Sequence, residues 1–100
     1  MLVVAGSLKL DPAKFEEARA AALEIMAATR QEAGNINYVF TQSLDEPGTI
    51  HIFEEWESQA ALDAHFKEPH MAAFQAKVGG FGVKDMKVQK YEVSSVGPVF

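Results

Sequence analysis

The histidines in the second half of the chain are the side chains whose chemistry is most useful near neutral pH. His65 and His70 lie in the stretch 53–74, which also carries the carboxylate of Glu54 near its start. An imidazole titrates near neutral pH and can take a proton from a weakly acidic substrate. We therefore predict His70 and His65 as catalytic residues. His70 is favoured because Pro69 fixes the backbone beside it, and Glu54 is the next candidate base.

The same residues do not have the spacing that a metal site requires. The chain has no cysteine, which excludes thiolate-bound zinc and iron–sulfur clusters. His65 and His70 are five residues apart on either side of Pro69, so they do not share one helical face. A composite site with His51 and Glu54 is geometrically possible, but no metal motif is present. We expect no metal.

Each of these residues also has a structural interpretation. His70 is suited to hydrogen bonding at a helix start, and His65 to a place at the surface or an interface. Trp56, at the end of an expected strand, is typical of a core residue. Glu54 and Glu55 face opposite sides of that strand, so they are not a catalytic pair. One is expected in water, whereas the other, if buried, needs partners or a raised pKa.

The elements that position these residues follow from apolar periodicity and from capping residues. The prediction is a strand over 2–10, a helix from 12 to about 33, strands over 36–44 and 49–56, a helix from Ser58 to Phe66, a helix over 69–78 and a strand over 84–93. Asp11 is an N-cap candidate, and Gly34 is a candidate for the left-handed conformation after the first helix. The apolar residues change face within the last strand, and we expect a bulge near Gln89.

This β-α-β-β-α-β order predicts a ferredoxin-like α+β fold, a four-stranded antiparallel sheet with its helices on one face. Both faces of the sheet carry large apolar residues, since Tyr38 and Phe40 oppose Val39, and Ile52 opposes Phe53. The helices can cover only one face. An apolar face left in water usually marks an interface, so we expect a homodimer with its sheets packed face to face.

Composition narrows the class of protein further. The chain has 100 residues, which predicts one domain, residues 2–93, with a tail at 94–100. Its net charge is −5, with 9 basic and 14 acidic residues and no basic cluster, so a nucleic acid or an anionic membrane is a poor partner. The start of the chain lacks the pattern of a signal peptide, and we expect a cytoplasmic protein.

Dinucleotide-binding, P-loop, zinc-protease and nucleophile-elbow motifs are absent. Four short segments occur instead, in this order: EAGNINY (32–38), FEEW (53–56), LDAH (62–65) and PHMAAF (69–74). The ordered set resembles the antibiotic biosynthesis monooxygenase (ABM) domain family over about residues 2–93. Asn35 stands where that family usually has cysteine.

The resemblance implies a ferredoxin-like dimer whose sheets form an α+β barrel, with a pocket between sheet and helices. Members of the family include monooxygenases that oxidise phenolic or quinol-type aromatics with O₂, without metal or flavin. We therefore expect a cofactor-independent monooxygenase that acts on a small, electron-rich aromatic substrate. A deprotonated phenol can itself reduce O₂, so the protein need only bind it, take the proton and stabilise the anion.

The pocket implied by the resemblance would be lined by residues suited to this chemistry. His70 and His65 would serve as bases, and Trp56, Tyr38, Asn37 and Glu54 would bind the substrate. Asn37 and Tyr38 are neighbours on one strand, so at most one of them faces the pocket.

Other functions of the same family remain open. Haem degradation is disfavoured because Ser7 and Phe74 stand where those members have asparagine and histidine, and only Trp56 is kept. An isomerase or detoxifying enzyme for a small reactive carbonyl is one alternative. A non-catalytic dimeric module that binds a small molecule is another.

Overall fold

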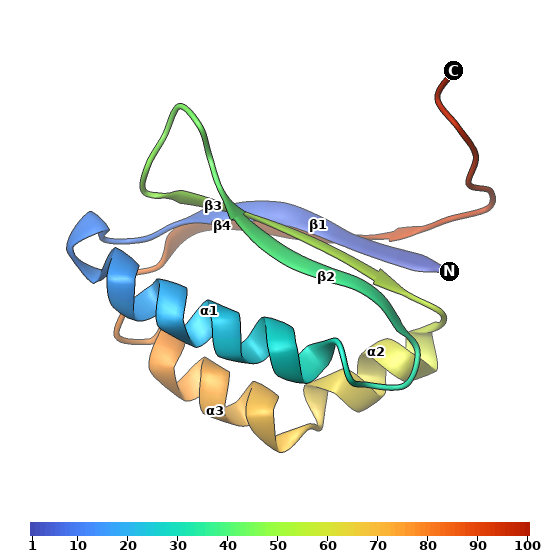
Figure 1. The fold of residues 1–100 in the computed structure, drawn as a ribbon, viewed down its shortest axis with the longest axis horizontal. Coiled ribbons are helices and arrows are strands. Elements are labelled where there is room, and N and C mark those ends of the chain that lie inside the picture. Colours follow the sequence, from blue (N-terminus) through green and yellow to red (C-terminus); the bar gives the residue numbers. More distant parts are fainter.

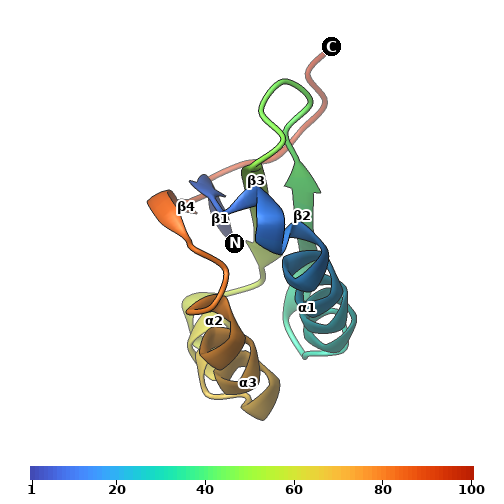
Figure 2. The ribbon, with the colours of Figure 1, turned by 90° about the vertical axis from the view of Figure 1, so that its left-hand side faces the viewer.

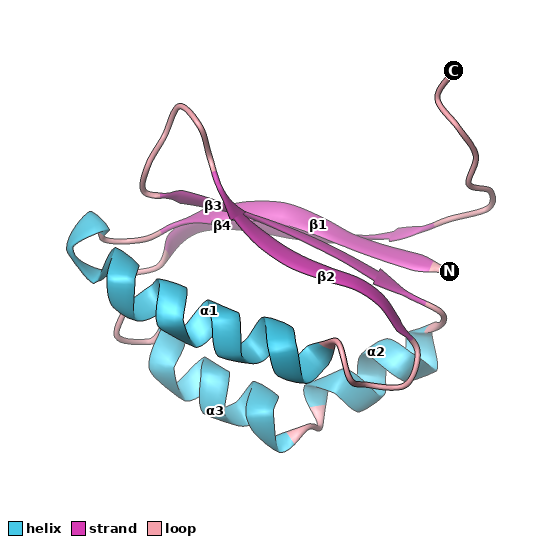
Figure 3. Ribbon diagram, in the orientation of Figure 1, coloured by secondary structure: helices cyan, strands magenta, loops and turns pink.

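Four stretches with alternating apolar residues form the strands of the computed structural model, which describes residues 1–100. The strands are β1 (Leu2–Lys9), β2 (Asn35–Gln42), β3 (Thr49–Trp56) and β4 (Lys84–Glu92). They form one sheet in the order β2-β3-β1-β4, and every neighbouring pair is antiparallel (Figure 3). This confirms the predicted four-stranded antiparallel sheet.

The helices begin at capping residues. A short 3₁₀ turn, η1 (Pro12–Lys14), leads into α1 (Phe15–Thr29), and α2 (Gln59–Phe66) and α3 (Pro69–Val78) follow β3. Asp11 accepts a hydrogen bond from the amide of Ala13 at 3.0 Å, and Ser58 accepts one from Ala61 at 3.2 Å. Both satisfy amides that a helix start leaves free.

The first helix is shorter than predicted. It ends at Thr29, and residues 30–34 form turns rather than helix. Gly34 adopts the left-handed conformation, with φ of 85°, where a side chain would be strained. A Cβ there would also crowd the side chain of Ala61 in α2, so glycine lets the segment after α1 lie close to α2.

All three helices lie on the same face of the sheet, where α3 runs beside α1 and α2 lies near the C-terminal end of α1 (Figures 1 and 2). The β2–β3 loop and the C-terminal segment project on the opposite side. The fold is therefore the ferredoxin-like α+β arrangement that the element order predicts. None of its helices is both long and apolar enough to cross a membrane.

The core lies between these two layers in two clusters. The larger one consists of Leu2, Val4, Ile25, Met26, Tyr38, Trp56 and Leu62. The smaller one, at the other end of α1, consists of Leu10, Ala18, Ala21 and Phe81. The small side chains of α1 allow the helix to approach the sheet closely, and a cavity remains between the two clusters and α3.

The outer face of the sheet has no covering layer. Val39 and Phe53 are opposite each other in the β2–β3 pair, and Phe53 and Tyr91 are 38% and 49% exposed. The tail beyond Glu92 forms no helix or strand, and its apolar residues Val96, Val99 and Phe100 are exposed. An uncovered face with these residues is the one predicted to meet a second copy of the chain.

The expected bulge near Gln89 is wrong. Gln89 pairs regularly with Ala5, and the register of the β1–β4 pair shifts instead between Ser7 and Lys9. Asp85, at that end of β4, has a positive φ of 51°. Most of β4 is exposed because it is an edge strand, and only Val88 is partly buried against the core.

Gly6 lies at the centre of β1, opposite Val88 of β4. A Cβ atom at this position would overlap the carbonyl oxygen of Lys87 and crowd the backbone of Val88. The pairing of β1 with β4 in this geometry therefore depends on a glycine.

Candidate functional site

A cavity of about 510 Å³ lies between the sheet and the helices α1 and α3. Of its 24 lining residues, 19 are hydrophobic, so it offers mainly apolar contacts. The polar lining residues are Arg19, Thr41, Gln42, Glu54 and Gln75. A cavity of this size and character is typical of a site for a small, largely apolar molecule.

Glu54 is the one carboxylate that lines the cavity. It is 8% exposed, and its Oε1 accepts a hydrogen bond of 2.9 Å from the indole Nε1 of Trp56. Burial raises the pKa of the Glu54 carboxyl, and the bond from Trp56 lowers it by a smaller amount. A raised pKa makes a carboxylate a stronger base, and such groups are common at catalytic sites.

Tyr38 lines the cavity beside Glu54. It is almost fully buried, and its ring lies 5.1 Å from that of Phe40 and 5.5 Å from the imidazole of His65. Burial, together with the negative charge of Glu54, raises the pKa of the Tyr38 hydroxyl above its usual value. The hydroxyl therefore keeps its proton.

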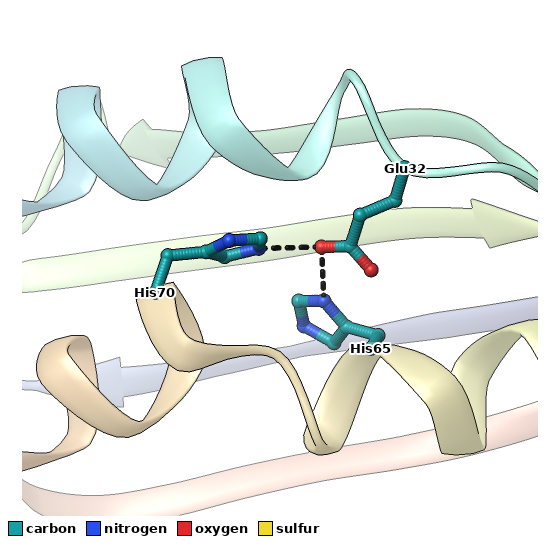
Figure 4. A group of neighbouring side chains, drawn as sticks. All are labelled: Glu32, His65 and His70. Carbon is teal, nitrogen blue, oxygen red and sulfur yellow. Dashed lines mark hydrogen bonds and ion pairs between the residues drawn. The ribbon is translucent and has the colours of Figure 1, made fainter.

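Two histidines and a glutamate form a second group beside the cavity (Figure 4). Oε2 of Glu32 lies 2.9 Å from Nδ1 of His65 and 2.6 Å from Nε2 of His70. His65 comes from α2, His70 from the first turn of α3, and Glu32 from the segment after α1. The group therefore joins the α2–α3 corner to the end of α1.

The geometry of this group fixes where the imidazole protons lie. An ionised carboxylate only accepts hydrogen bonds, so the nitrogen that each histidine turns to Glu32 must carry a proton. The His65 ring is buried and packs against the indole of Trp56, with centroids 4.8 Å apart. Glu32 thus orients His65, and His65 in turn packs on the indole that binds Glu54.

Glu32, His65 and His70 are also the residues that could hold a divalent metal. Their three ligand atoms lie within 4.8 Å of one another, and two imidazoles with a carboxylate are a common ligand set. Here, however, the carboxylate oxygen itself lies at hydrogen-bond distance from both nitrogens. A metal would need ligands at about 2.0–2.2 Å and the loss of the proton from each facing nitrogen.

The structure places the predicted site residues in three different environments. Tyr38 and Glu54 line the cavity, and Trp56 lies behind Glu54. His65 and His70 are not among the lining residues and are bonded to Glu32.

Asn37 and Tyr38 do face opposite sides of β2, as their alternation predicts. The side chain of Asn37 is exposed and lies 3.4 Å from Oε1 of Glu55. It does not line the cavity. Glu32 was not among the predicted site residues, although it begins the EAGNINY segment. Its position in that segment was the signal that could have identified it.

Comparison with known proteins assigns the family. The sequence profile of the antibiotic biosynthesis monooxygenase (ABM) domain matches residues 1–77. The chain belongs to this family. Its ABM domain is 31% identical over 77 residues to YcnE of Bacillus subtilis, a proposed monooxygenase, and covers 81% of that protein. It is 33% identical over 93 residues to the uncharacterised protein sll1783 of Synechocystis, of which the chain spans 63%.

Solved structures of similar sequence share the whole fold. A proposed antibiotic biosynthesis monooxygenase from Deinococcus radiodurans superposes with a TM-score of 0.92 at 26% identity, over 100% of this chain and 99% of that one. Rv0793 of Mycobacterium tuberculosis superposes with a TM-score of 0.87 at 26% identity, over 97% and 98% of the two chains. The ABM fold therefore extends past residue 77 and includes α3 and β4.

Proposed function

We propose that this ABM protein is a monooxygenase that oxidises a small, electron-rich phenol or quinol with O₂ and needs neither metal nor flavin. The observation that carries the proposal is the apolar cavity with one buried carboxylate, Glu54, which an indole holds beside its cross-strand neighbour Tyr38. Family membership supports the reaction class. The apolar lining supports an aromatic substrate.

Glu54 is the base in this proposal. Its Oε1 is bound by Trp56, which leaves Oε2 free to accept the proton of a substrate hydroxyl. Burial raises the pKa of Glu54, which brings its proton affinity closer to that of a phenol and makes the transfer less unfavourable. Tyr38, which keeps its own proton, donates a hydrogen bond to the phenolate that forms.

The phenolate then supplies the electrons. A phenol and O₂ contain the same atoms as a quinone and water, so one oxygen atom enters the ring and the other leaves as water. The ring provides every electron that O₂ accepts, and no external reductant is required. The protein's part is to bind the ring away from water, remove the proton and stabilise the anion.

His65 and His70 have a supporting role in this proposal. Neither lines the cavity, and both donate to Glu32. They hold the indole of Trp56 and thereby the carboxylate of Glu54. This differs from the prediction made from the sequence, in which His70 itself is the base, and the two assignments lead to different results in one experiment.

Oxygen consumption with a panel of phenols, naphthols and quinols tests the proposal. We expect Glu54→Gln to lower the rate by about 10²–10⁴-fold, the usual effect of removing a working base. Glu55→Gln, the neighbouring carboxylate on the opposite face of β3, should leave the rate within about twofold. A large loss in His70→Ala with little loss in Glu54→Gln would instead assign the base to His70.

The same carboxylate could transfer a proton within a substrate without O₂. An isomerase acting on a small carbonyl compound would use Glu54 in this way, and a binding module would use the cavity alone. If no compound of the panel supports oxygen uptake above the rate without protein, the monooxygenase proposal is wrong. Substrate conversion without O₂ would then separate the isomerase from the binding module.

A further inference from the structure

The ionisable side chains of the cavity lie at different positions along its length. Glu54 is opposite Val4 in the sheet, whereas Ile50 is opposite Leu8, and all four residues line the cavity. Four residues of strand separate these two pairs, which corresponds to about 13 Å. Glu54 therefore lies toward one end of the cavity, and Leu8 and Ile50, with the uncharged Gln42 beside them, lie toward the other.

One cation lines the cavity, and it comes from α1. The lining face of that helix consists of Phe15, Ala18, Arg19, Ala22, Leu23 and Met26. Met26 lies at the Glu54 end, because it packs in the same core cluster as Tyr38 and Trp56. Arg19 precedes Met26 by about two helical turns, or roughly 10 Å. The guanidinium of Arg19 is thus carried on the part of α1 that is remote from the carboxylate.

Arg19 has no acidic partner in the structure. The ion pairs of the protein involve Lys9, Lys14, Lys77 and the two histidines bonded to Glu32. Arg30 differs from Arg19, because its side chain donates to the carbonyl oxygen of Tyr38 at 3.1 Å. Arg19 is exposed, so its donors remain available to a molecule in the cavity.

We propose that the cavity selects aromatic compounds that carry an anionic group, with the ring among the apolar side chains and the anion at Arg19. A guanidinium binds a carboxylate or sulfonate with two parallel hydrogen bonds. At the Glu54 end, an anion would meet a like charge whenever that carboxylate is ionised, as the proposed function requires. The two charges together orient the ligand, and under the proposed function its hydroxyl group faces Glu54.

Two dyes with the same aromatic skeleton test the inference without any reaction. Anilinonaphthalene sulfonate carries an anion, and N-phenyl-naphthylamine is its uncharged parent. Both increase in emission when they enter an apolar cavity. We expect Arg19→Gln to weaken binding of the sulfonate by about two- to fivefold, the upper part of the range of an exposed ion pair. The uncharged dye should change by less than about twofold.

Two further variants serve as controls. Lys14→Gln removes an exposed cation that does not line the cavity, and it should affect neither dye. Ala22→Phe places a ring inside the cavity and should weaken both dyes. Equal effects of Arg19→Gln on the two dyes, no effect on either, or dye binding that survives Ala22→Phe would each overturn the inference.

The inference can also be separated from the proposed function. For this purpose, oxygen uptake is measured with a naphthol and with its sulfonated analogue, and their KM values are compared in the parent and in Arg19→Gln. If the sulfonate binds selectively through Arg19 but no oxygen is taken up, the proposed ligand class is supported and the monooxygenase function is contradicted. If oxygen is taken up but Arg19→Gln does not change the difference in KM between the two compounds, the monooxygenase function is supported and the proposed ligand class is contradicted.

Discussion

The indole of Trp56 donates a hydrogen bond of 2.9 Å to the carboxylate of Glu54, two residues before it on the same strand. Residues two apart on a strand face the same side, so the geometry of β3 alone brings the two side chains together. Both are buried. The bond fixes one oxygen of Glu54 and favours its ionised form, whereas burial favours the protonated form.

Removing this donor should move the pH dependence of the proposed reaction. In Trp56→Phe, the pKa of Glu54 should rise further, because the bond that favours its ionised form is lost while burial remains. The acid limb of the rate should shift to higher pH, with a loss of rate that is largest at low pH and smaller as pH rises, as measured by oxygen uptake. An unchanged acid limb would show that the indole does not tune Glu54.

The stability of the protein should also respond to the raised pKa of Glu54. The folded state holds this proton more tightly than the unfolded state, so the stabilisation is complete below the ordinary carboxyl pKa and is lost as pH rises through the raised pKa. Glu54→Gln cannot ionise. Its free energy of unfolding, relative to that of the parent, should therefore increase as pH rises from the ordinary carboxyl pKa through the raised pKa of Glu54.

Urea denaturation at several pH values measures this difference. Glu55→Gln is the matched control, since Glu55 lies on the outer face of the same strand and not in the cavity. Its difference from the parent should stay nearly constant with pH. A parallel trend in the two variants would mean that burial of Glu54 is not the cause.

The two histidines should contribute unequally to stability. His65→Ala removes a buried ring that packs on Trp56 and Tyr38, and the cost should be about 2–4 kcal/mol. The His70 side chain is partly exposed, and losing its bond to Glu32 should cost about 1 kcal/mol. Denaturant unfolding of both variants checks the order, and equal costs would contradict the burial argument.

Chelation should leave the protein unchanged. The sequence spacing predicts no metal, and Oε2 of Glu32 already accepts a hydrogen bond from one nitrogen of each of His65 and His70. We expect the thermal midpoint and any oxygen uptake to survive exhaustive treatment with a chelator. Binding of one equivalent of Zn²⁺ that is lost in Glu32→Gln but kept in His51→Gln would refute this expectation.

The outer face of the sheet should hold a second copy of the chain. Val39 and Phe53 are cross-strand neighbours on that face, and a charge placed there would be buried unpaired in a face-to-face dimer. Sedimentation at micromolar concentration should show a dimer for the parent and a monomer or unfolded chain for Val39→Asp or Phe53→Asp. Ala20→Asp, at an exposed position of α1, should remain dimeric. A well-folded parent monomer would exclude the arrangement.

Local signals predicted some elements closely and others poorly. Ser58 and Pro69 begin their helices where expected, because capping and the missing amide of proline act within a few residues. The first helix ended earlier than its alanine-rich pattern indicates. The irregularity of β4 was misplaced, since an edge strand with little burial gives no clear alternation of apolar and polar residues.

The sequence predicted only part of the candidate site, for a related reason. Glu54 and Trp56 share one strand, so alternation alone places them together. Glu32 contacts His65, which is 33 positions away in the sequence, and hydrophobic periodicity cannot predict a contact between residues so far apart. The sequence identified the histidines by their chemistry, but only the packing of α2 and α3 against the end of α1 shows that they face Glu32 rather than the cavity.

Gly6 also determines how the chain behaves when a mutation disrupts the pairing of β1 with β4. Because any side chain there would collide with the backbone of β4, Gly6→Val should detach that edge strand and leave the amide and carbonyl groups of β1 unpaired. An unpaired strand edge recruits strands from other molecules and leads to aggregation. Light scattering of Gly6→Val during refolding should rise with protein concentration, and a clear solution of folded protein would show that β4 can adjust.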